Sequence, residues 1–247
     1  AVVAVAIING YDPIVATTAA FVSGTMAGAV TGVLHTKANI DGLLAGILTQ
    51  IGLYSINLRI MGGANLSLLR EDTLFSALRA SGQMGTNSWT GPGVLGPVAI
   101  VVLAIIIWFL HTDLGLAMRA TGDNSEMIRS FGVSTDFTKT LTLALSNGFV
   151  GMCGALIAQY QGFADISMGI GLILVGLASV ILGQAILGQR RLLLAVFAVI
   201  VGAVLYRLII FAALRVGLDP NDMKAITALL VVIALLVARW KAVGGRV

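Results

Sequence analysis

The sequence predicts an all-α, polytopic integral membrane protein with about eight transmembrane or re-entrant helices, and three observations support this. Hydrophobic residues make up 58% of the 247 residues and charged residues only 11%, whereas a soluble domain has about 25% charged residues. The mean hydropathy is +1.00, and the apolar spans are too many and too long for one buried core. The 30 glycines suit helices that pack closely in a bilayer.

Eight apolar spans are expected to be helical, because a backbone inside the bilayer has to satisfy its own hydrogen bonds. They are residues 1–9, 14–34, 42–60, 94–111, 137–158, 168–188, 192–213 and 222–240. Span 1–9 starts inside apolar sequence with no charged segment before it, so we expect an N-terminal helix that is incomplete or missing. Span 168–188 has no charge but four glycines interrupt it, and a re-entrant helix is the alternative to a full crossing.

The distribution of Lys and Arg indicates the orientation of the spans. With segments 35–41, 111–139, 189–191 and 239–247 on the cytoplasmic side, nine Lys and Arg residues lie inside and six outside. Segment 61–93 is then extracytoplasmic. Within it, residues 71–79 carry acids first and a base last, which predicts a short amphipathic helix. This helix either rests on the membrane or forms a landing surface for an extracytoplasmic partner.

A small-residue stripe runs along span 14–34, where Gly24, Gly28 and Gly32 stand four residues apart. Such spacing places all three on one helix face, where another helix can approach closely. We therefore expect these glycines to act in helix packing.

A polar stripe runs along span 42–60, where Gln50, Tyr54 and Asn57 share one helical face. Polar groups in the bilayer are costly unless they meet a partner or a water-filled cavity. The stripe therefore either makes interhelical hydrogen bonds or lines a translocation path. Asn147, in span 137–158, is a further candidate for the path.

Sequence signals of catalysis are missing. The chain has no H-E-x-x-H and no G-x-S-x-G motif, and the lack of any Gly-Lys dipeptide excludes a Walker A loop. His35, His111 and the single Cys153 do not form a metal-ligand pattern. The basic residues form no run that would indicate nucleic-acid binding. We expect no catalytic residue, no metal and no cofactor in this chain, so any ATP hydrolysis has to come from another subunit.

The polar segment 111–139 interrupts this apolar chain and carries charges of both signs. We expect two short helices in it, at 116–120 and 126–131, with a break at Gly122, an N-cap among residues 123–125 and a helix end at Gly132. Met127, Ile128 and Phe131 would give the second helix an apolar face opposite Glu126 and Arg129. Such a helix either docks a partner protein or rests on lipid headgroups.

Several motifs in the chain resemble those of a known family. Gly115-x-Ala117-x-Arg119-Ala120-Thr121-Gly122-x-Asn124, followed by Phe131-Gly132-Val133, resembles the cytoplasmic loop of ABC-transporter permeases of the branched-chain amino acid and ribose type. His35-Thr36-Lys37, the stretch 43–69 and the stretch 169–187 resemble a subgroup labelled as tryptophan/tyrosine transport permeases. The resemblance extends over essentially the whole chain.

The resemblance implies a type II ABC importer-like permease in the bacterial cytoplasmic membrane, with residues 1–247 as one transmembrane domain. Its partners would be a second permease subunit of the same sequence, a cytoplasmic ABC ATPase dimer carrying ATP and Mg, an extracytoplasmic solute-binding protein and membrane lipid. The ATPase would grip the helix at about Ser125 to Phe131, and the stretch from Arg119 to Asn124 would set the angle of that helix. The residues expected to couple to the ATPase are Arg119, Gly122, Asn124, Ser125, Glu126, Met127, Ile128, Arg129, Phe131 and Gly132. The solute would be amino acid-like, with aromatic amino acids among the candidates.

A stand-alone secondary transporter or channel is the alternative function. Such transporters commonly hold a charged group inside the membrane to couple an ion. No Asp, Glu, His or Lys lies at the centre of any predicted span, which favours the ATP-driven permease.

Overall fold

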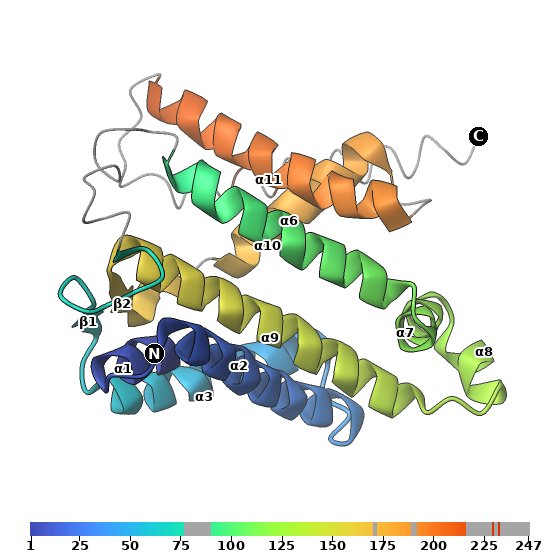
Figure 1. Ribbon diagram of the computed structural model, residues 1–247. Helices are drawn as coiled ribbons and strands as arrows, with labels where there is room; N and C mark the ends of the chain where they lie inside the picture. Colours follow the sequence, from blue (N-terminus) through green and yellow to red (C-terminus); the bar gives the residue numbers. More distant parts are fainter. Residues whose placement is uncertain (77–89, 170–171, 189–191, 216–228, 230–231, 233–247) are drawn as a thin grey trace. The chain divides into compact units, whose positions relative to one another are not determined.

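The computed structural model describes residues 1–76, 90–169, 172–188 and 192–215, together with residues 229 and 232. These residues belong to two compact units, Ala1–Ser167 and Met168–Val247 (Figure 1). A short 3-10 helix at Ile166–Gly169 lies where the first unit ends and the second begins.

The first unit contains seven helices and a two-stranded sheet among its described residues. The helices are α1 (Val2–Ile8), α2 (Pro13–Thr36), α3 (Gly42–Met61), α6 (Thr90–Leu110), α7 (Asp113–Asp123), α8 (Ser125–Ser130) and α9 (Thr135–Gln161). The sheet pairs β1 (Asn65–Ser67) with β2 (Phe163–Asp165) in antiparallel register, with Leu66 opposite Ala164.

The long helices begin and end where the sequence supplies capping residues. Asp12 precedes Pro13 and accepts a hydrogen bond from the Ile14 N–H at 2.8 Å, which caps α2. Asp41 caps α3 in the same way through the Leu43 N–H at 2.9 Å. At the other ends, Gly62 and Gly162 have φ of 66° and 81°. Glycine adopts this left-handed conformation without the steric penalty of a Cβ, and the helices end there.

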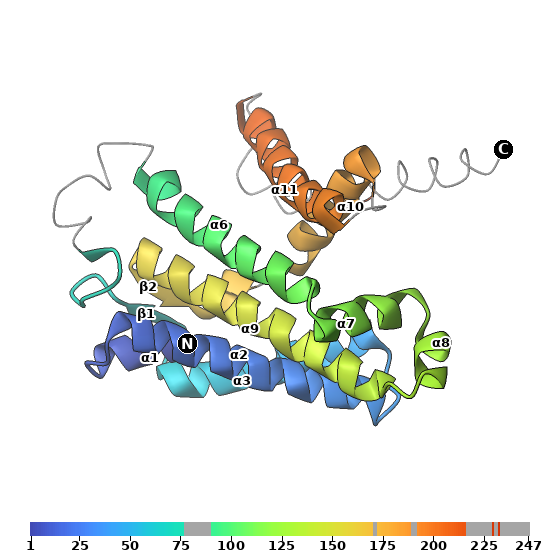
Figure 2. The ribbon, with the colours of Figure 1, turned by 45° about the vertical axis from the view of Figure 1, so that its right-hand side comes forward.

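The antiparallel pair α2–α9 is the centre of the first unit. The two helices lie side by side in both views, with α2 running one way and α9 the other (Figures 1 and 2). A Cβ added at Gly24 would lie 2.5 Å from the Asn147 carbonyl oxygen, and one at Gly32 would lie 2.7 Å from the Thr140 Cα. The missing side chains therefore permit backbone-to-backbone approach, which stabilises helix pairs in membranes by close van der Waals contact.

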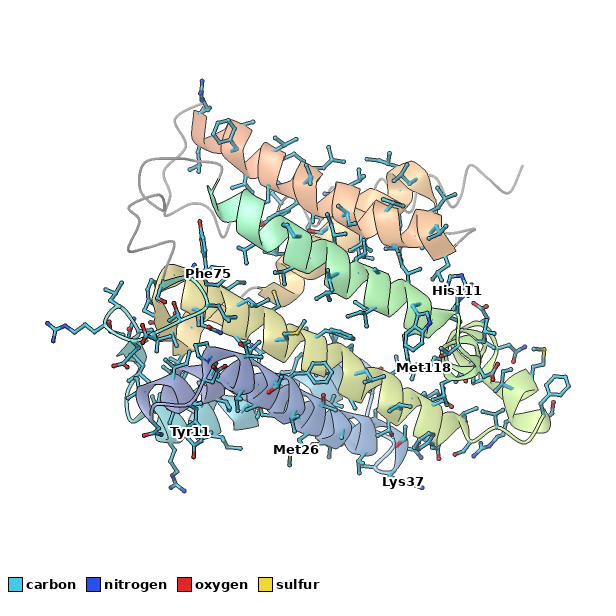
Figure 3. All side chains as sticks on the ribbon, in the orientation of Figure 1. Tyr11, Met26, Lys37, Phe75, His111 and Met118 are labelled. Atoms are coloured by element: carbon cyan, nitrogen blue, oxygen red, sulfur yellow. The ribbon has the colours of Figure 1, made fainter. Side chains whose placement is uncertain are left out.

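The first unit has two distinct ends, called here the strand end and the α8 end. The strand end carries β1, β2 and the turn between α1 and α2, with Tyr11 and Phe75 (Figure 3). The α8 end carries α7, α8 and the turn between α2 and α3, with Lys37, His111 and Met118 (Figure 3). Segments 35–41 and 111–139, expected on one side of the membrane, thus lie at the same end of this unit.

The second unit is built on the pair α10 (Leu172–Leu187) and α11 (Leu192–Arg215). A Cβ at Gly183 would clash with the Ala198 carbonyl oxygen, and one at Gly202 would clash with the Ser179 carbonyl oxygen. Both glycines therefore lie where the helices cross closely. Ala178 and Tyr206 are buried beside this crossing.

The all-α, multi-pass prediction is confirmed. Seven of the eight predicted spans coincide with helices, and span 222–240 falls almost wholly outside the described residues. Four described helices are long and apolar enough to cross a membrane: α2, α3, α9 and α11. A fifth crossing is possible by length and composition if α6 is counted with α7, to which it is bent by 78°. α10 is shorter, with 16 residues.

Two details of the sequence prediction were wrong, and one feature of the fold was not predicted. Gly122 does not break its helix, since α7 continues through it to Asp123; an exposed helix tolerates one glycine at a cost of about 1 kcal/mol. The acids at 71–72 do not begin a helix but lie in a bend and loop, and only residue 76 is helical before the described residues end. The β1–β2 pair was not predicted, because strands of three residues show no recognisable periodicity.

Candidate functional site

The chain bends sharply between α6 and α7, at the α8 end of the first unit. Thr112 caps α7 by accepting a hydrogen bond from the Gly115 N–H at 3.4 Å. Gly115 is buried, and a Cβ there would clash with the Phe109 carbonyl oxygen. Only glycine fits this close approach, so the corner fixes the 78° angle at which α7 leaves α6.

The short helix α8 and the residue after it leave two large apolar side chains uncovered by the rest of the chain. Met127 is 49% exposed and Phe131, directly after the helix, is 75% exposed. Glu126 and Arg129 are also exposed, whereas Ile128 is half-buried. Large apolar groups gathered on a polar, projecting segment are typical of a protein-binding surface.

Local hydrogen bonds define both ends of α8. The Asn124 side chain accepts a hydrogen bond from the Met127 N–H at 3.0 Å, which caps the helix. Gly132 has φ of 85° and ends the turn, and its N–H donates to the Arg129 carbonyl at 3.0 Å. The sequence prediction of an N-cap among residues 123–125 and a glycine end at Gly132 is confirmed. Ser125 is the first residue of α8 rather than its cap.

The other residues predicted for ATPase coupling lie on α7. Arg119 is exposed near the middle of α7, and Gly122 is exposed in its last turn. Thr121 is buried between them and donates its hydroxyl to the Ala117 carbonyl at 2.7 Å. The structure thus joins the predicted residues into two consecutive helices at one end of the first unit.

A small apolar pocket lies between α7 and the start of α9. Its volume is about 90 Å³, and it is lined by Leu114, Ala117, Met118, Val133, Ser134, Phe137, Thr138 and Leu141. α7 packs on α9 around this pocket. Because α8 connects these two helices along the chain, their packing holds α8 in place.

Removing the Asn124 cap should loosen α8 without unfolding the protein. We expect Asn124→Ala to cost about 1 kcal/mol of local helix stability, which corresponds to roughly fivefold faster amide exchange at Met127. Asn124→Asp keeps the acceptor oxygen and is the matched control. Unchanged exchange in the alanine variant, measured by hydrogen–deuterium exchange, would show that the cap does not hold α8.

The predicted polar stripe of α3 lies on the side of the helix away from α2. Ala45 is fully buried and Thr49 accepts a hydrogen bond from Thr31 of α2 at 2.9 Å, so this face contacts α2. Gln50 and Tyr54 lie on the opposite face and are exposed, and Asn57 is half-buried. A bilayer does not satisfy such groups, so this face requires a water-filled cavity or another protein surface.

Asn147 is not on the same surface as the polar stripe of α3. It lies on α9 against Gly24 and Gly28 of α2, and its side-chain amide donates to the Leu143 carbonyl of its own helix at 2.9 Å. The structure therefore groups Asn147 with Gly24, Gly28 and Gly32 at the α2–α9 contact.

The α3 stripe can be tested by its access to water. In a Cys153→Ser background, we expect single cysteines at positions 50, 54 and 57 to react with a charged, membrane-impermeant thiol reagent in at least one nucleotide state. A cysteine in place of the exposed Ile51 is the matched control and should react at least about tenfold more slowly if it faces lipid, where ionised thiolate is disfavoured. Protection of all three stripe positions in every state would instead support interhelical packing.

The buried Gln159, near the C-terminal end of α9, was not found by sequence reasoning. It is fully buried, and its side-chain amide donates to the Thr17 hydroxyl of α2 at 2.8 Å. Its carbonyl oxygen accepts a hydrogen bond from the Leu74 N–H at 3.2 Å. A glutamine followed by Tyr160 and Gln161 is typical of a polar helix end. The sequence therefore does not predict that the Gln159 side chain is buried.

The described residues contain no cluster of side chains that could hold a metal ion. Nowhere in this part of the chain do three His, Cys, Asp or Glu side chains come together. His35 bonds through Nδ1 to the Ile40 carbonyl at 2.9 Å, and His111 bonds through Nδ1 to the Ile107 carbonyl at 2.7 Å. Both histidines thus serve helix ends. The candidate functional site consists of two surfaces, the apolar face of α8 and the polar stripe of α3.

Residues 1–238 match the family model described as the permease component of a branched-chain amino acid transport system. The tyrosine transport system permease protein of Clostridioides difficile is 39% identical over 94% of this chain and 75% of its own length. A protein of Rickettsia prowazekii, RP368, is 34% identical over 87% of this chain and 76% of its own length.

More distant relatives belong to a different transport system. The autoinducer 2 import system permease protein LsrC of Salmonella typhimurium is 30% identical over 70% of this chain and 48% of its own length. No solved structure matches the chain.

Proposed function

This chain belongs to the family of branched-chain amino acid transport system permease components, and we propose that it is the translocation subunit of an ATP-driven ABC importer for an amino acid-like solute. The family assignment and the apolar helices make it a multi-pass membrane permease. ATP and Mg would be bound by a partner ATPase dimer, and the membrane would be the bacterial cytoplasmic membrane.

The observation that carries the proposal is the apolar face of α8. Met127 and Phe131 are 49% and 75% exposed on a capped helix at the end of the first unit. An ATPase subunit that covered them would gain roughly 2 kcal/mol for each anchor. The exposed Glu126 and Arg129 beside them suit the polar rim of such a contact. ATP-driven closure of the ATPase subunits would then move α8 and switch the access of the path.

The polar stripe of α3 supports a path formed with a second, identical copy of the chain. Gln50 and Tyr54 point away from the contact with α2. A second copy that faced this stripe would enclose a weakly polar route. Such a route suits an importer in which a solute-binding protein supplies most of the selectivity. Asn147 contributes to the path only if the α2–α9 contact opens during transport.

The proposed solute is an amino acid, with tyrosine the first to test. The support is the name of the Clostridioides difficile relative, a tyrosine transport system permease protein. The LsrC relatives are named for the import of autoinducer 2, so the family as a whole handles more than one solute class.

The mechanism is tested by measuring which energy source drives the uptake of solute. The full chain is purified in mild detergent with the proteins that accompany it and is reconstituted in vesicles. We expect an ATPase to be present in stoichiometric amount and uptake to require Mg-ATP on the α8 side. Uptake that runs on an ion gradient without ATP or an ATPase would favour the stand-alone transporter.

A further inference from the structure

One arginine lies inside the apolar helix α11 of the second unit rather than at its end. α11 runs without a break from Leu192 to Arg215 and is long and apolar enough to cross a membrane (Figure 1). Arg207 comes eight residues before the end of the helix, a distance of about 12 Å along the axis. The helix is about 36 Å long and the hydrocarbon core of a bilayer is about 30 Å thick. When α11 crosses the membrane, Arg207 therefore lies at the depth of the hydrocarbon.

The geometry of an α-helix directs the Arg207 side chain toward the middle of α11. Each Cα–Cβ bond of a helix is tilted toward the helix N-terminus, which here means toward Leu192 and away from Arg215. The residue one turn earlier is Ala203, which is small and exposed and leaves room for a bound group. To reach the headgroups beyond Arg215, the side chain would have to turn back along the helix. The position therefore does not suit an arginine that only extends to the membrane surface.

Arg207 is not covered by its own unit. The face of α11 that packs on α10 is formed by buried residues at every fourth position, Ala198, Gly202, Tyr206 and Ile210. Arg207 is turned by about 100° from Tyr206 and is exposed. Among the described residues, none is joined to Arg207 by a hydrogen bond or an ion pair. A charged group at this depth requires a bundle interior or a water-filled cavity, and a partner of opposite charge.

The apolar helices of the chain supply no such partner. α10 and α11 contain no Asp or Glu, and the acids of the second unit, Asp219 and Asp222, follow the end of α11 in sequence. α2, α3 and α6 contain no acid either, and Asp136 of α9 lies in the first turn of its helix. A second copy of the chain therefore offers no carboxylate from the middle of these helices. The anion that pairs with Arg207 has to come from a small molecule or a lipid.

An aromatic ring follows one turn after Arg207. Phe211 is four residues later, which places the two Cβ atoms about 5–6 Å apart, and it is 57% exposed. The Arg215 guanidinium lies over the Phe211 ring, 5.4 Å from its centroid, and holds it by a cation–π contact. This face thus combines an apolar ring with a guanidinium, whose planar fork binds a carboxylate through two parallel hydrogen bonds. An aromatic amino acid carries its carboxylate and its ring on adjacent carbons, which suits this spacing.

We propose that Arg207 binds the carboxylate of an amino acid-like solute within the membrane, and that Phe211 contacts the side chain of that solute. This inference rests on the proposed function, because it requires that the chain translocates such a solute. A lipid phosphate would offer the same charge, but the depth and direction of Arg207 favour the solute. An arginine inside a bilayer is costly for insertion, so its presence is explained by what it binds rather than by stability.

The experiment measures whether the surroundings of Arg207 hold water and attract anions. In a Cys153→Ser background, Ala203→Cys places one thiol one turn from Arg207 in the reconstituted complex. Modification of this chain is followed with a sulfonate-bearing thiosulfonate and with its trimethylammonium analogue, in each nucleotide state. We expect the ratio of the anionic to the cationic rate to fall at least about tenfold in Arg207→Gln, the lower limit of counter-ion enrichment by a charged cleft. Arg59→Gln removes a charge from the last turn of α3 and should leave the ratio unchanged.

A second measurement identifies the anion as the carboxylate of the solute. With Mg-ATP and the accompanying proteins present, a mixture of amino acids that includes tyrosine should protect position 203 from both reagents. The corresponding mixture of amino acid amides, which lack the carboxylate, should not protect it. Arg207→Lys keeps the charge but loses the planar fork, so it should keep the ratio of the two rates and lose most of the protection.

The outcomes separate this inference from the proposed function. If position 203 reacts with neither reagent in any nucleotide state, Arg207 lies against lipid and the inference is wrong, even where uptake requires ATP. A ratio that does not depend on position 207, or equal protection by the amino acids and their amides, would also overturn it. Protection that requires the carboxylate, together with uptake driven by an ion gradient, would support the site and contradict the ATP-driven mechanism instead.

Discussion

Replacing Met127 and Phe131 together by aspartate should abolish ATP-driven uptake while the protein still inserts into the membrane. The two side chains are the exposed apolar groups of the α8 turn, and a charge in place of a buried anchor costs about 2 kcal/mol or more at each position. We expect uptake to fall at least about a hundredfold, since every 1.4 kcal/mol corresponds to a factor of ten. ATP hydrolysis should no longer depend on solute delivery.

The matched control keeps both positions apolar. Met127→Leu with Phe131→Leu preserves a hydrophobic face on α8 and should retain most of the uptake. Neither position lies inside the α2–α9 contact, so both double variants should reach the membrane in similar amounts. Coupled uptake at the parental rate in the aspartate variant would remove α8 from the mechanism.

Adding a side chain at Gly28 should separate α2 from α9. Its Cβ would clash with the Leu143 carbonyl oxygen and would lie 2.7 Å from the Asn147 Cβ. Because a backbone oxygen cannot rotate away, the helices have to move apart. We expect Gly28→Ala to lower the free energy of unfolding by about 1–3 kcal/mol and Gly28→Leu by more. The loss should appear as a lower midpoint temperature of the detergent-purified protein.

Gly154 provides the control for Gly28, because adding a side chain there should have the opposite effect on stability. It is exposed on α9, and a Cβ there would have no neighbour within 4 Å in this chain. Gly154→Ala should therefore raise stability by up to about 1 kcal/mol, because alanine is the better helix former. If Gly28→Ala stabilised the protein as Gly154→Ala is expected to do, the close α2–α9 contact would be wrong.

Long apolar helices were predictable from the sequence because their signal is simple. A span of about 20 apolar residues has few alternatives in a membrane, and acids such as Asp12 and Asp41 fix where helices begin. The capped turn at α8 was predictable for the same reason, since Asn124 and Gly132 carry their own local conformations.

Contacts between distant segments were not predictable in this way. Pairing of β1 with β2 joins residues about one hundred positions apart, and the Gln159–Thr17 bond joins residues 142 positions apart. Neither leaves a periodic signal, because each depends on where the helix ends meet in space. Asn147 illustrates the converse: its polarity suggested a path, yet it bonds within its own helix beside Gly28.

Photo-cross-linking from position 131 tests the central claim, that α8 docks an ATPase, most directly. A benzophenone amino acid in place of Phe131 keeps an aromatic group at a site that is 75% exposed, and the same group in place of the exposed Tyr11, at the strand end, is the control. We predict a cross-link from position 131, and none from position 11, to a protein that binds ATP. Cross-links from position 131 to lipid alone, in membranes that hold the intact complex, would contradict the account.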